Sequence, residues 1–182
     1  MDAKKKTVFL GLAFVVFLAL AYVENIFFFG VLGYILRNQF LAVAMLFVHN
    51  VLVVSLILLG MTFYVNLVAL NFFRKEKYGN IVLEHPETFA IAFAILVIFL
   101  SILRGSSLLG GIKIEDLPII IVVSAPLGII EGYGVYFTIK KTLCRTMSMK
   151  DLAYIYGIFF LAAVMEVGFI NLLTTVISIG AA

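Results

Sequence analysis

Apolar residues occur in long runs along the chain, and short polar stretches separate these runs. A helix needs about 20 apolar residues to cross the hydrocarbon core of a bilayer, with about 17 to 25 usual. We expect five transmembrane helices, at Thr7–Phe29, Phe40–Met61, Thr88–Leu103, Pro118–Ile139 and Leu152–Ile179. The pattern therefore predicts an all-α integral membrane protein, a bundle of about five transmembrane helices.

The end of the second helix is open to two interpretations. The stretch Met61–Phe73 is also mostly apolar, so the helix either stops near Met61 or continues as a bent or interfacial extension. Gly60 is the natural position for a kink in the second case. The start of the third helix is clearer, because Pro86 suits a first helical turn and Glu87 favours the positive end of the helix dipole.

The composition agrees with a chain surrounded by lipid. Hydrophobic residues make up 64% of the 182 residues and charged residues 13%, and the mean hydropathy is +1.21. Soluble domains carry about 25% charged residues. No linker or low-complexity segment divides the chain, so we expect residues 1–182 to form a single transmembrane helical domain. The N-terminal lysines and the apolar run after them resemble a secretory signal, but the run continues past Ala21 without an Ala-x-Ala site, which favours a retained helix.

Basic residues concentrate in alternate polar stretches. With the N-terminus inside, ten lysines and arginines fall on the inner side and three on the outer side. The inner ones are Lys4, Lys5, Lys6, Arg74, Lys75, Lys77, Lys140, Lys141, Arg145 and Lys150, and the outer ones are Arg37, Arg104 and Lys113. The positive-inside rule then places the N-terminus in the cytoplasm and the C-terminus outside the cell membrane. Because topology accounts for the net charge of +3, no nucleic-acid partner is expected.

Strongly polar residues within the expected spans are the candidate functional residues. They are His49, Asn50, Glu131, Glu166 and Asn171. A charged group at this depth costs about 2.5 to 3.5 kcal/mol on insertion scales, so each must face another helix, a cavity or a partner. Interhelical hydrogen bonding is the simpler interpretation for each, and an ion or proton path is the alternative. Glu24 lies near the outer end of its span, where solvation at the interface is the simpler interpretation.

A stripe of small residues runs along the fourth expected helix. Its members are spaced by four, at Ser124, Gly128 and Gly132. Such stripes let a second helix approach closely. Glu131 borders the stripe, about 60° from Gly128 around the helix axis. Because Glu166 also follows small residues in the fifth helix, we expect either that these helices face each other or that two protomers meet here, with a homodimer as one form.

Two patterns resemble a known family. Phe40 is followed by His49-Asn50, Gly60 and Asn71, and the fourth span contains the element Pro126-x-Gly128-x-x-Glu131. Together they resemble the stage II sporulation protein M family over about Phe40 to Lys141. The chain departs from that pattern at Leu127, where a histidine is expected, and at His49, where an asparagine is more usual.

The resemblance implies a small multi-span membrane protein that acts as a scaffold or assembly factor for other membrane or envelope proteins. The runner-up is a small ion- or proton-coupled channel or transporter that uses the buried acids Glu131 and Glu166. Partners would be the lipid bilayer, other copies of the chain, or envelope proteins. We expect no cofactor.

Enzymatic motifs do not support a catalytic function. The chain has no Gly-x-Ser-x-Gly elbow, no phosphate-binding Gly-x-x-x-x-Gly-Lys loop and no His-Glu-x-x-His pair. Cys144 is the only cysteine, so no intrachain disulfide forms. A metal hydrolase built from His49, Glu131 and Glu166 is a weaker alternative, because no two of these residues share a helix at ligand spacing. We therefore expect neither an enzyme nor a metal site.

Overall fold

The chain forms helices throughout its described part. The computed structural model describes residues 3–35, 38–70, 72, 81–108 and 117–180, without the side chains of residues 29–30, 32–34, 101–108, 117–121, 123–124 and 172–180. The helices are α1 (Ala3–Ile35), α2 (Gln39–Ala69), α3 (Ile81–Glu84), α4 (Pro86–Leu108), α5 (Leu117–Leu143) and α6 (Met149–Gly180). The predicted all-α class is confirmed for these residues.

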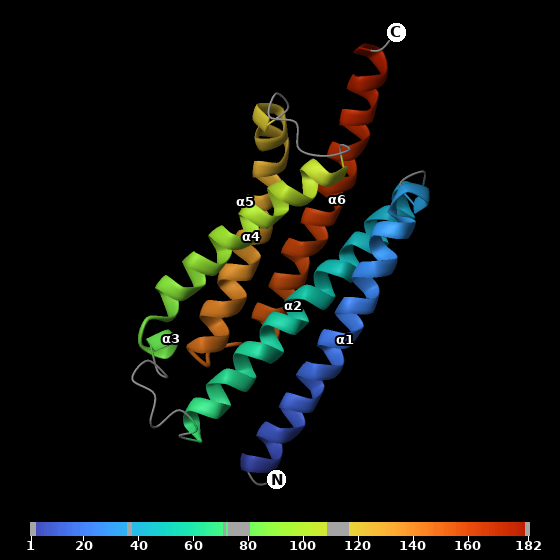
Figure 1. Cartoon of the computed structure of the whole chain (residues 1–182). Helices are drawn as coiled ribbons and strands as arrows, with labels where there is room; N and C mark the ends of the chain where they lie inside the picture. The colour runs from blue at the N-terminus through green and yellow to red at the C-terminus, as the bar shows by residue number, and fades with distance from the viewer. Residues whose placement is uncertain (1–2, 36–37, 71, 73–80, 109–116, 181–182) are drawn as a thin grey trace.

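Consecutive long helices run in opposite directions (Figure 1). α1, α4 and α6 run one way and α2 and α5 the other, so the two chain termini lie at opposite ends of the bundle. α2 is central, because it packs against α1, α5 and α6, while α4 packs mainly on α5. α1 makes extensive contact only with α2 within the described part of the chain.

Three of the helices are long and apolar enough to cross a membrane. Among the described residues these stretches are Ala3–Phe28, Gln39–Ala69 and Met149–Asn171, and Pro86–Leu100 is a shorter apolar helix. Length and composition therefore indicate membrane association. The count of five spans stays a prediction.

The structure has the longer of the two alternatives for the second helix. α2 continues without a break to Ala69, and the Leu70 amide then donates to the carbonyl of Asn66. The first expected helix is also longer than predicted, because α1 extends to Ile35. α4 begins at Pro86, as predicted, and its first backbone bond runs from Phe89 to the carbonyl of His85. The short helix α3 was not predicted.

Two reciprocal glycine–phenylalanine contacts set the register of α1 against α2. A Cβ atom at Gly60 would come within 2.9 Å of Cε2 of Phe14, and one at Gly11 within 2.9 Å of Cε2 of Phe63. The two rings stack with centroids 6.5 Å apart. Gly60 therefore serves to admit a ring, and α2 passes through it as a continuous helix.

Buried apolar residues form two clusters at different heights. The first joins α2, α4, α5 and α6 and contains Val54, Val65, Ala90, Val135, Ile139, Leu143, Ile155 and Phe159. The second joins α1, α2 and α6 and contains Phe28, Ala42, Leu46, Ala163 and Val167. On α2 the residue between Leu46 of the second cluster and Val54 of the first, at the same spacing of four, is Asn50. Asn50 thus lies where the two clusters meet.

Candidate functional site

Asn50 lies inside the bundle with only 4% of its surface exposed. Its side-chain Nδ2 has no hydrogen-bond partner among the described residues. A buried amide that lacks a partner costs free energy, and such groups in proteins call for an explanation such as a bound water or ion. Asn50 is therefore the most unusual of the predicted polar residues.

Glu131 on α5 lies near the height of Asn50. Its exposure is 5%, and it has an interaction partner. α2 and α5 pack together and run in the same direction. Val54 and Val135 share a buried cluster, and each follows its polar residue by one helical turn. Asn50 and Glu131 therefore both border this cluster, on the side of the N-terminal ends of α2 and α5.

Glu166 on α6 is the third buried polar residue of this region. It is 7% exposed and also has an interaction partner. Opposite contacts between α5 and α6, such as Lys141 with Asp151 at 3.2 Å and the ring pair of Phe137 and Tyr154, set their antiparallel register. By this register Glu166 lies about five residues, or about 7 Å, beyond Glu131 toward the C-terminal end of the bundle.

The small-residue stripe of α5 faces α4. A Cβ atom at Gly132 would come within 2.8 Å of Cγ1 of Ile98 and 3.3 Å of the carbonyl oxygen of Ala94. At Gly128 the nearest atom would be Cγ2 of Ile98, at 3.3 Å. The stripe thus lies in a contact within one chain. Ser124 lies outside the residues whose side chains are described, and the half-buried Asn171 is the last described side chain of α6.

His49 makes a side-chain contact that the sequence interpretation missed. Its Nδ1 lies 2.8 Å from Oε2 of Glu24 on α1, and the side chains of His49 and Glu24 are 14% and 20% exposed. The ring of Phe28 stacks on the imidazole with centroids 4.7 Å apart. The interpretation of Glu24 as a simply solvated residue is therefore wrong, because its carboxylate is the partner of His49.

The pair also places both residues at one depth. Glu24 lies five residues past Ala19, the middle residue of α1, and His49 lies five residues before Val54, the middle of α2. Both are therefore about 7 Å from the midpoints of their helices, on the side of the α1–α2 turn. We use the name polar layer for Glu24, His49, Asn50, Glu131 and Glu166, of which Glu166 lies about 7 Å beyond Glu131 along the bundle.

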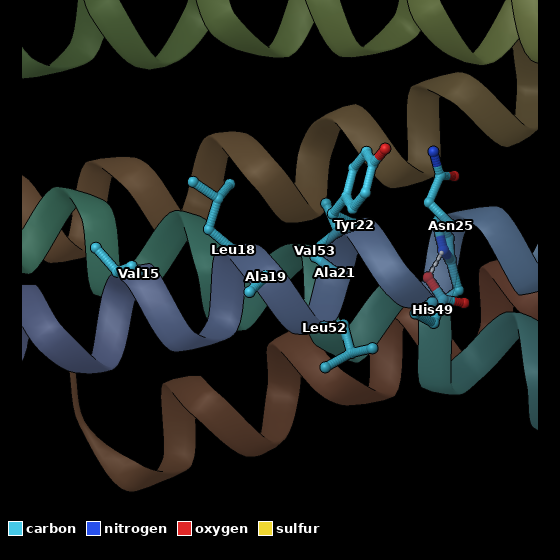
Figure 2. Close-up of a pocket in the computed structure, with 10 residues that line it drawn as sticks. Val15, Leu18, Ala19, Ala21, Tyr22, Asn25, His49, Leu52 and Val53 are labelled. Atoms are coloured by element: carbon cyan, nitrogen blue, oxygen red, sulfur yellow. Dashed lines mark hydrogen bonds and ion pairs between the residues drawn. The ribbon is translucent and has the colours of Figure 1, made fainter.

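A groove between α1 and α2 adjoins the Glu24–His49 pair (Figure 2). Its volume is about 630 Å³. Figure 2 shows Tyr22, Asn25 and His49 gathered toward one end, with Val15 and Leu18 toward the other. Glu24 also lines the groove, so the ionisable groups of the groove occur together at one end.

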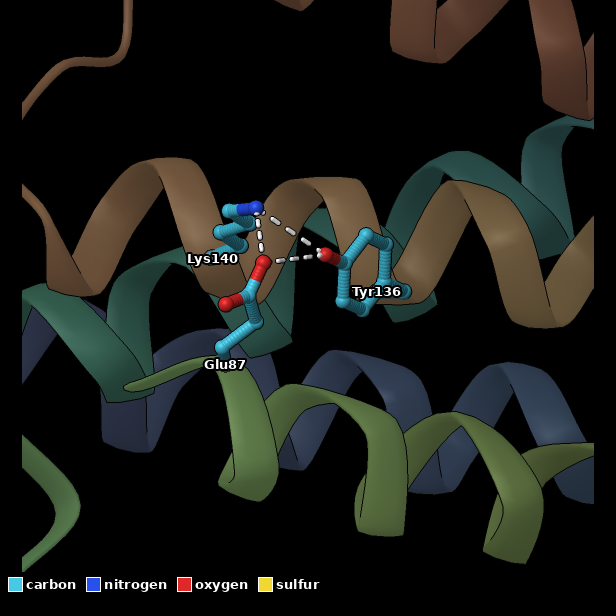
Figure 3. Close-up of polar contacts among 3 residues, drawn as sticks. All are labelled: Glu87, Tyr136 and Lys140. Carbon is cyan, nitrogen blue, oxygen red and sulfur yellow. Dashed lines mark hydrogen bonds and ion pairs between the residues drawn. The ribbon is translucent and has the colours of Figure 1, made fainter. Parts of the chain in front are cut away.

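A second group of polar residues lies where α4 begins and α5 ends (Figure 3). Glu87 at the start of α4 pairs with the ammonium of Lys140 on α5, and the Tyr136 hydroxyl lies 3.2 Å from Oε1 of Glu87. The hydrogen bond and charge of Lys140 lower the pKa of Glu87, and the carboxylate raises the pKa of Lys140. Glu87 is exposed and Lys140 is half-buried, and both lie just outside the expected spans, so their contact fastens the ends of α4 and α5.

The start of α6 carries a reciprocal cap. The Ser148 amide donates to Oδ2 of Asp151 at 2.9 Å, and the Asp151 amide donates to Oγ of Ser148 at 3.2 Å. Hydrogen bonds from Ser148, together with the charge of Lys141, lower the pKa of Asp151. This is a capping box, for which the spacing Ser148-x-x-Asp151 is the sequence signal.

The chemistry available to the polar layer is proton exchange or the binding of a small polar group. Its members come from α1, α2, α5 and α6. No three histidine, cysteine, aspartate or glutamate side chains come together as metal ligands in the described part of the chain. Cys144 is exposed, and it is distant in sequence from both histidines, His49 and His85.

No family model, curated protein or solved structure matches the chain. The resemblance to the stage II sporulation protein M family therefore stays a prediction, based on the residues quoted for it.

Proposed function

We propose that the chain is a five-span membrane protein with its N-terminus in the cytoplasm. Three helices of sufficient length support this, as does the alternating direction of the five long helices. The lysines at the start of α1 lie at the same end of the bundle as Lys140 and Lys141 at the end of α5. A cluster of basic residues at one end is the arrangement that the positive-inside rule favours.

Within that membrane, the chain acts as a scaffold that holds other membrane proteins or further copies of itself. The observation that carries this proposal is a heptad-spaced stripe within the exposed apolar surface of α1, a surface that also includes Val8, Leu12, Val15 and Ile26. Its members are Phe9, Val16, Leu20, Val23 and Phe27, with exposures of 68%, 57%, 50%, 49% and 65%. Phe9, Val16 and Val23 are spaced by seven, as are Leu20 and Phe27, which follow the heptad spacing of a coiled-coil seam.

The position of this stripe favours a partner helix. α1 packs extensively only on α2 in the described part, and most of its length is available for a further contact. Left-handed packing with this spacing is common between transmembrane helices. A scaffold of this kind needs a rigid bundle behind the contact surface, which the close α4–α5 contact at Gly132 provides.

Cysteine cross-linking tests the scaffold. In a Cys144→Ser background reconstituted into vesicles, Val16→Cys and Val23→Cys should give a cross-linked dimer of the chain. Leu18→Cys is the matched control, because it is 48% exposed but lies about 200° around the helix from Val16. Absence of cross-linking at both positions, or equal cross-linking at all three, would remove the stripe from the argument.

Transport of protons or small cations is a second candidate, and the polar layer favours it. Asn50, Glu131 and Glu166 come from three helices and are all buried, and Nδ2 of Asn50 has no partner among the described residues. Intramembrane ionisable residues commonly mark ion or proton pathways. A water or a hydrated ion beside Asn50 would satisfy the amide.

Flux in proteoliposomes separates the two candidates. Transport predicts a saturable flux that Glu131→Gln or Glu166→Gln abolishes while the fold stays intact, because the carboxylate must titrate. A scaffold predicts no flux above that of empty liposomes under an imposed proton or sodium gradient. In that case the same glutamine variants should still form the cross-linked dimer.

A further inference from the structure

The α1–α2 groove has a polarity gradient along its length. Val15, Leu18, Leu52 and Val53 make its long part apolar. Glu24, Asn25 and His49 lie at the other end. A molecule that fits this groove would carry an apolar chain and a polar head.

The groove is about as long as an acyl chain of one leaflet. From Val15 to Asn25 the helix rises about 15 Å, because each residue adds about 1.5 Å, and one leaflet of the hydrocarbon core is also about 15 Å thick. Val15 lies about 6 Å to the N-terminal side of Ala19, the middle of α1, and Asn25 lies about 9 Å to the other side. The polar end therefore lies toward the α1–α2 turn, and a lipid in the groove would have its headgroup on that side.

The shape of the groove suits an occupant thinner than a helix. The groove is open to the surface and has a volume of about 630 Å³, whereas a helix is about 10 Å across. An extended acyl chain is thinner than a helix, and it fits a groove of this shape.

The polar end of the groove suits a positively charged headgroup. Glu24 uses Oε2 for the contact with His49, and its Oε1 has no partner among the described residues. Its side chain is only 20% exposed, so little water competes for that oxygen. Carboxylate oxygens form charge-assisted hydrogen bonds with ammonium groups.

We propose that the groove binds one bilayer lipid with a primary-ammonium headgroup. The ammonium contacts Glu24 beside His49, and one acyl chain lies along Leu18 and Leu52. This inference rests on the proposed membrane insertion. It is independent of the scaffold stripe, because Leu18 and Val16 lie on opposite flanks of α1.

Lipid retention by the purified full-length chain tests the proposal. Native mass spectrometry would compare phosphatidylethanolamine with phosphatidylglycerol carrying the same acyl chains. The wild type should retain the ethanolamine lipid about tenfold more tightly, which is the ratio that about 1.4 kcal/mol represents. Glu24→Gln should remove this preference, so that the two lipids are retained about equally.

Substitutions in the apolar part provide the second arm. Val53→Trp fills the groove and should weaken retention of both lipids, whereas Leu161→Trp, at a 53% exposed position of α6 outside the groove, should weaken neither. Val53→Trp should keep the circular dichroism and thermal unfolding of the wild type, which separates lost binding from lost folding.

Several results would overturn the lipid site. Equal retention of both lipids, insensitive to Glu24→Gln, would mean that only surrounding bilayer lipid is carried along. A disulfide-linked dimer through Leu18→Cys would place a second copy on the groove instead. Release of the chain from membranes by alkaline carbonate would overturn membrane insertion itself, whereas an embedded chain without lipid preference would overturn this proposal alone.

Discussion

The α1–α2 pair and the α4–α5 pair both pack closely at glycines, but their polar contacts lie in different surroundings. Both bring two helices together at glycines, with Gly11 and Gly60 admitting phenylalanine rings and Gly132 admitting Ile98. The α4–α5 pair places its charged contact, Glu87 with Lys140, at an exposed helix end. The α1–α2 pair places Glu24 and His49 within the apolar length of both helices.

This difference separates contacts that only fasten helices from contacts that can also do chemistry. The charges of an exposed ion pair attract each other in a medium of high dielectric constant, so the pair contributes little to the stability of the fold. A shielded pair is held in a medium of lower dielectric constant, where removing one partner leaves the other unsatisfied. The α1–α2 contact is therefore both more important for stability and better suited to bind a charged group.

Gly132→Leu should have the largest effect on stability. The added side chain meets Ile98 and the Ala94 backbone, and overpacking of this kind costs about 1 to 3 kcal/mol. Thermal unfolding in detergent, followed by circular dichroism, measures the change. Gly157→Leu is the matched control, because a Cβ atom there meets nothing within 4 Å. If both variants unfold at the same temperature, Gly132 is not required for the close packing of α4 against α5.

Glu24→Ala should lower the free energy of unfolding by about 1 to 2 kcal/mol, because it leaves His49 without its acceptor. A double-mutant cycle with His49→Ala should show a coupling of at least about 0.5 kcal/mol. Asn25→Ala, at the neighbouring exposed position, should change stability little. Additive effects of the two substitutions would contradict a direct contact.

Asn50→Leu should raise the free energy of unfolding by about 1 kcal/mol or leave it unchanged, because it removes a buried donor without a partner among the described residues. Chemical denaturation in mixed micelles would measure this, with the exposed Asn25→Leu as the comparison. A loss of stability in Asn50→Leu alone would mean that the amide has a partner, such as a water, that holds the layer together.

The Glu87–Lys140 contact should show the smallest effect, mainly as a dependence on pH. The folded pKa of Glu87 lies below its ordinary value of 4.5, so the contact stabilises the fold above that pH and the contribution is lost as the pH falls further. The folded pKa of Lys140 is raised above 10.5, so its contribution is complete below that value. Glu87→Gln should reduce the fall of the melting temperature at acid pH. If that fall is unchanged in the variant, other carboxylates cause it.

Much of the fold could be predicted because apolar runs report helix positions directly. The start of α4 at Pro86 and the close contact of Gly128 and Gly132 also follow local rules of sequence. The sequence did not determine where α2 ends, because Met61–Phe73 is apolar enough either to continue the helix or to follow it as a separate stretch. Composition carries no information on whether such a stretch remains straight.

The candidate site was predicted only in part because pairing depends on register. His49, Asn50, Glu131 and Glu166 were identifiable as polar residues in apolar surroundings. Glu24 pairs with His49 across 25 positions, and this requires the α1–α2 register that Phe14 and Phe63 set. A single sequence gives no measure of that register, so Glu24 was assigned to the interface.

Labelling of the chain ends in intact cells or sealed vesicles tests the central claim, a membrane protein that crosses the bilayer an odd number of times. A single cysteine introduced as Ala182→Cys in a Cys144→Ser background should react with an impermeant thiol reagent added outside. The exposed native Cys144, in the loop after α5, should react only after the membrane is opened. Reaction of Ala182→Cys only after lysis, or of Cys144 from outside, would contradict the proposed topology.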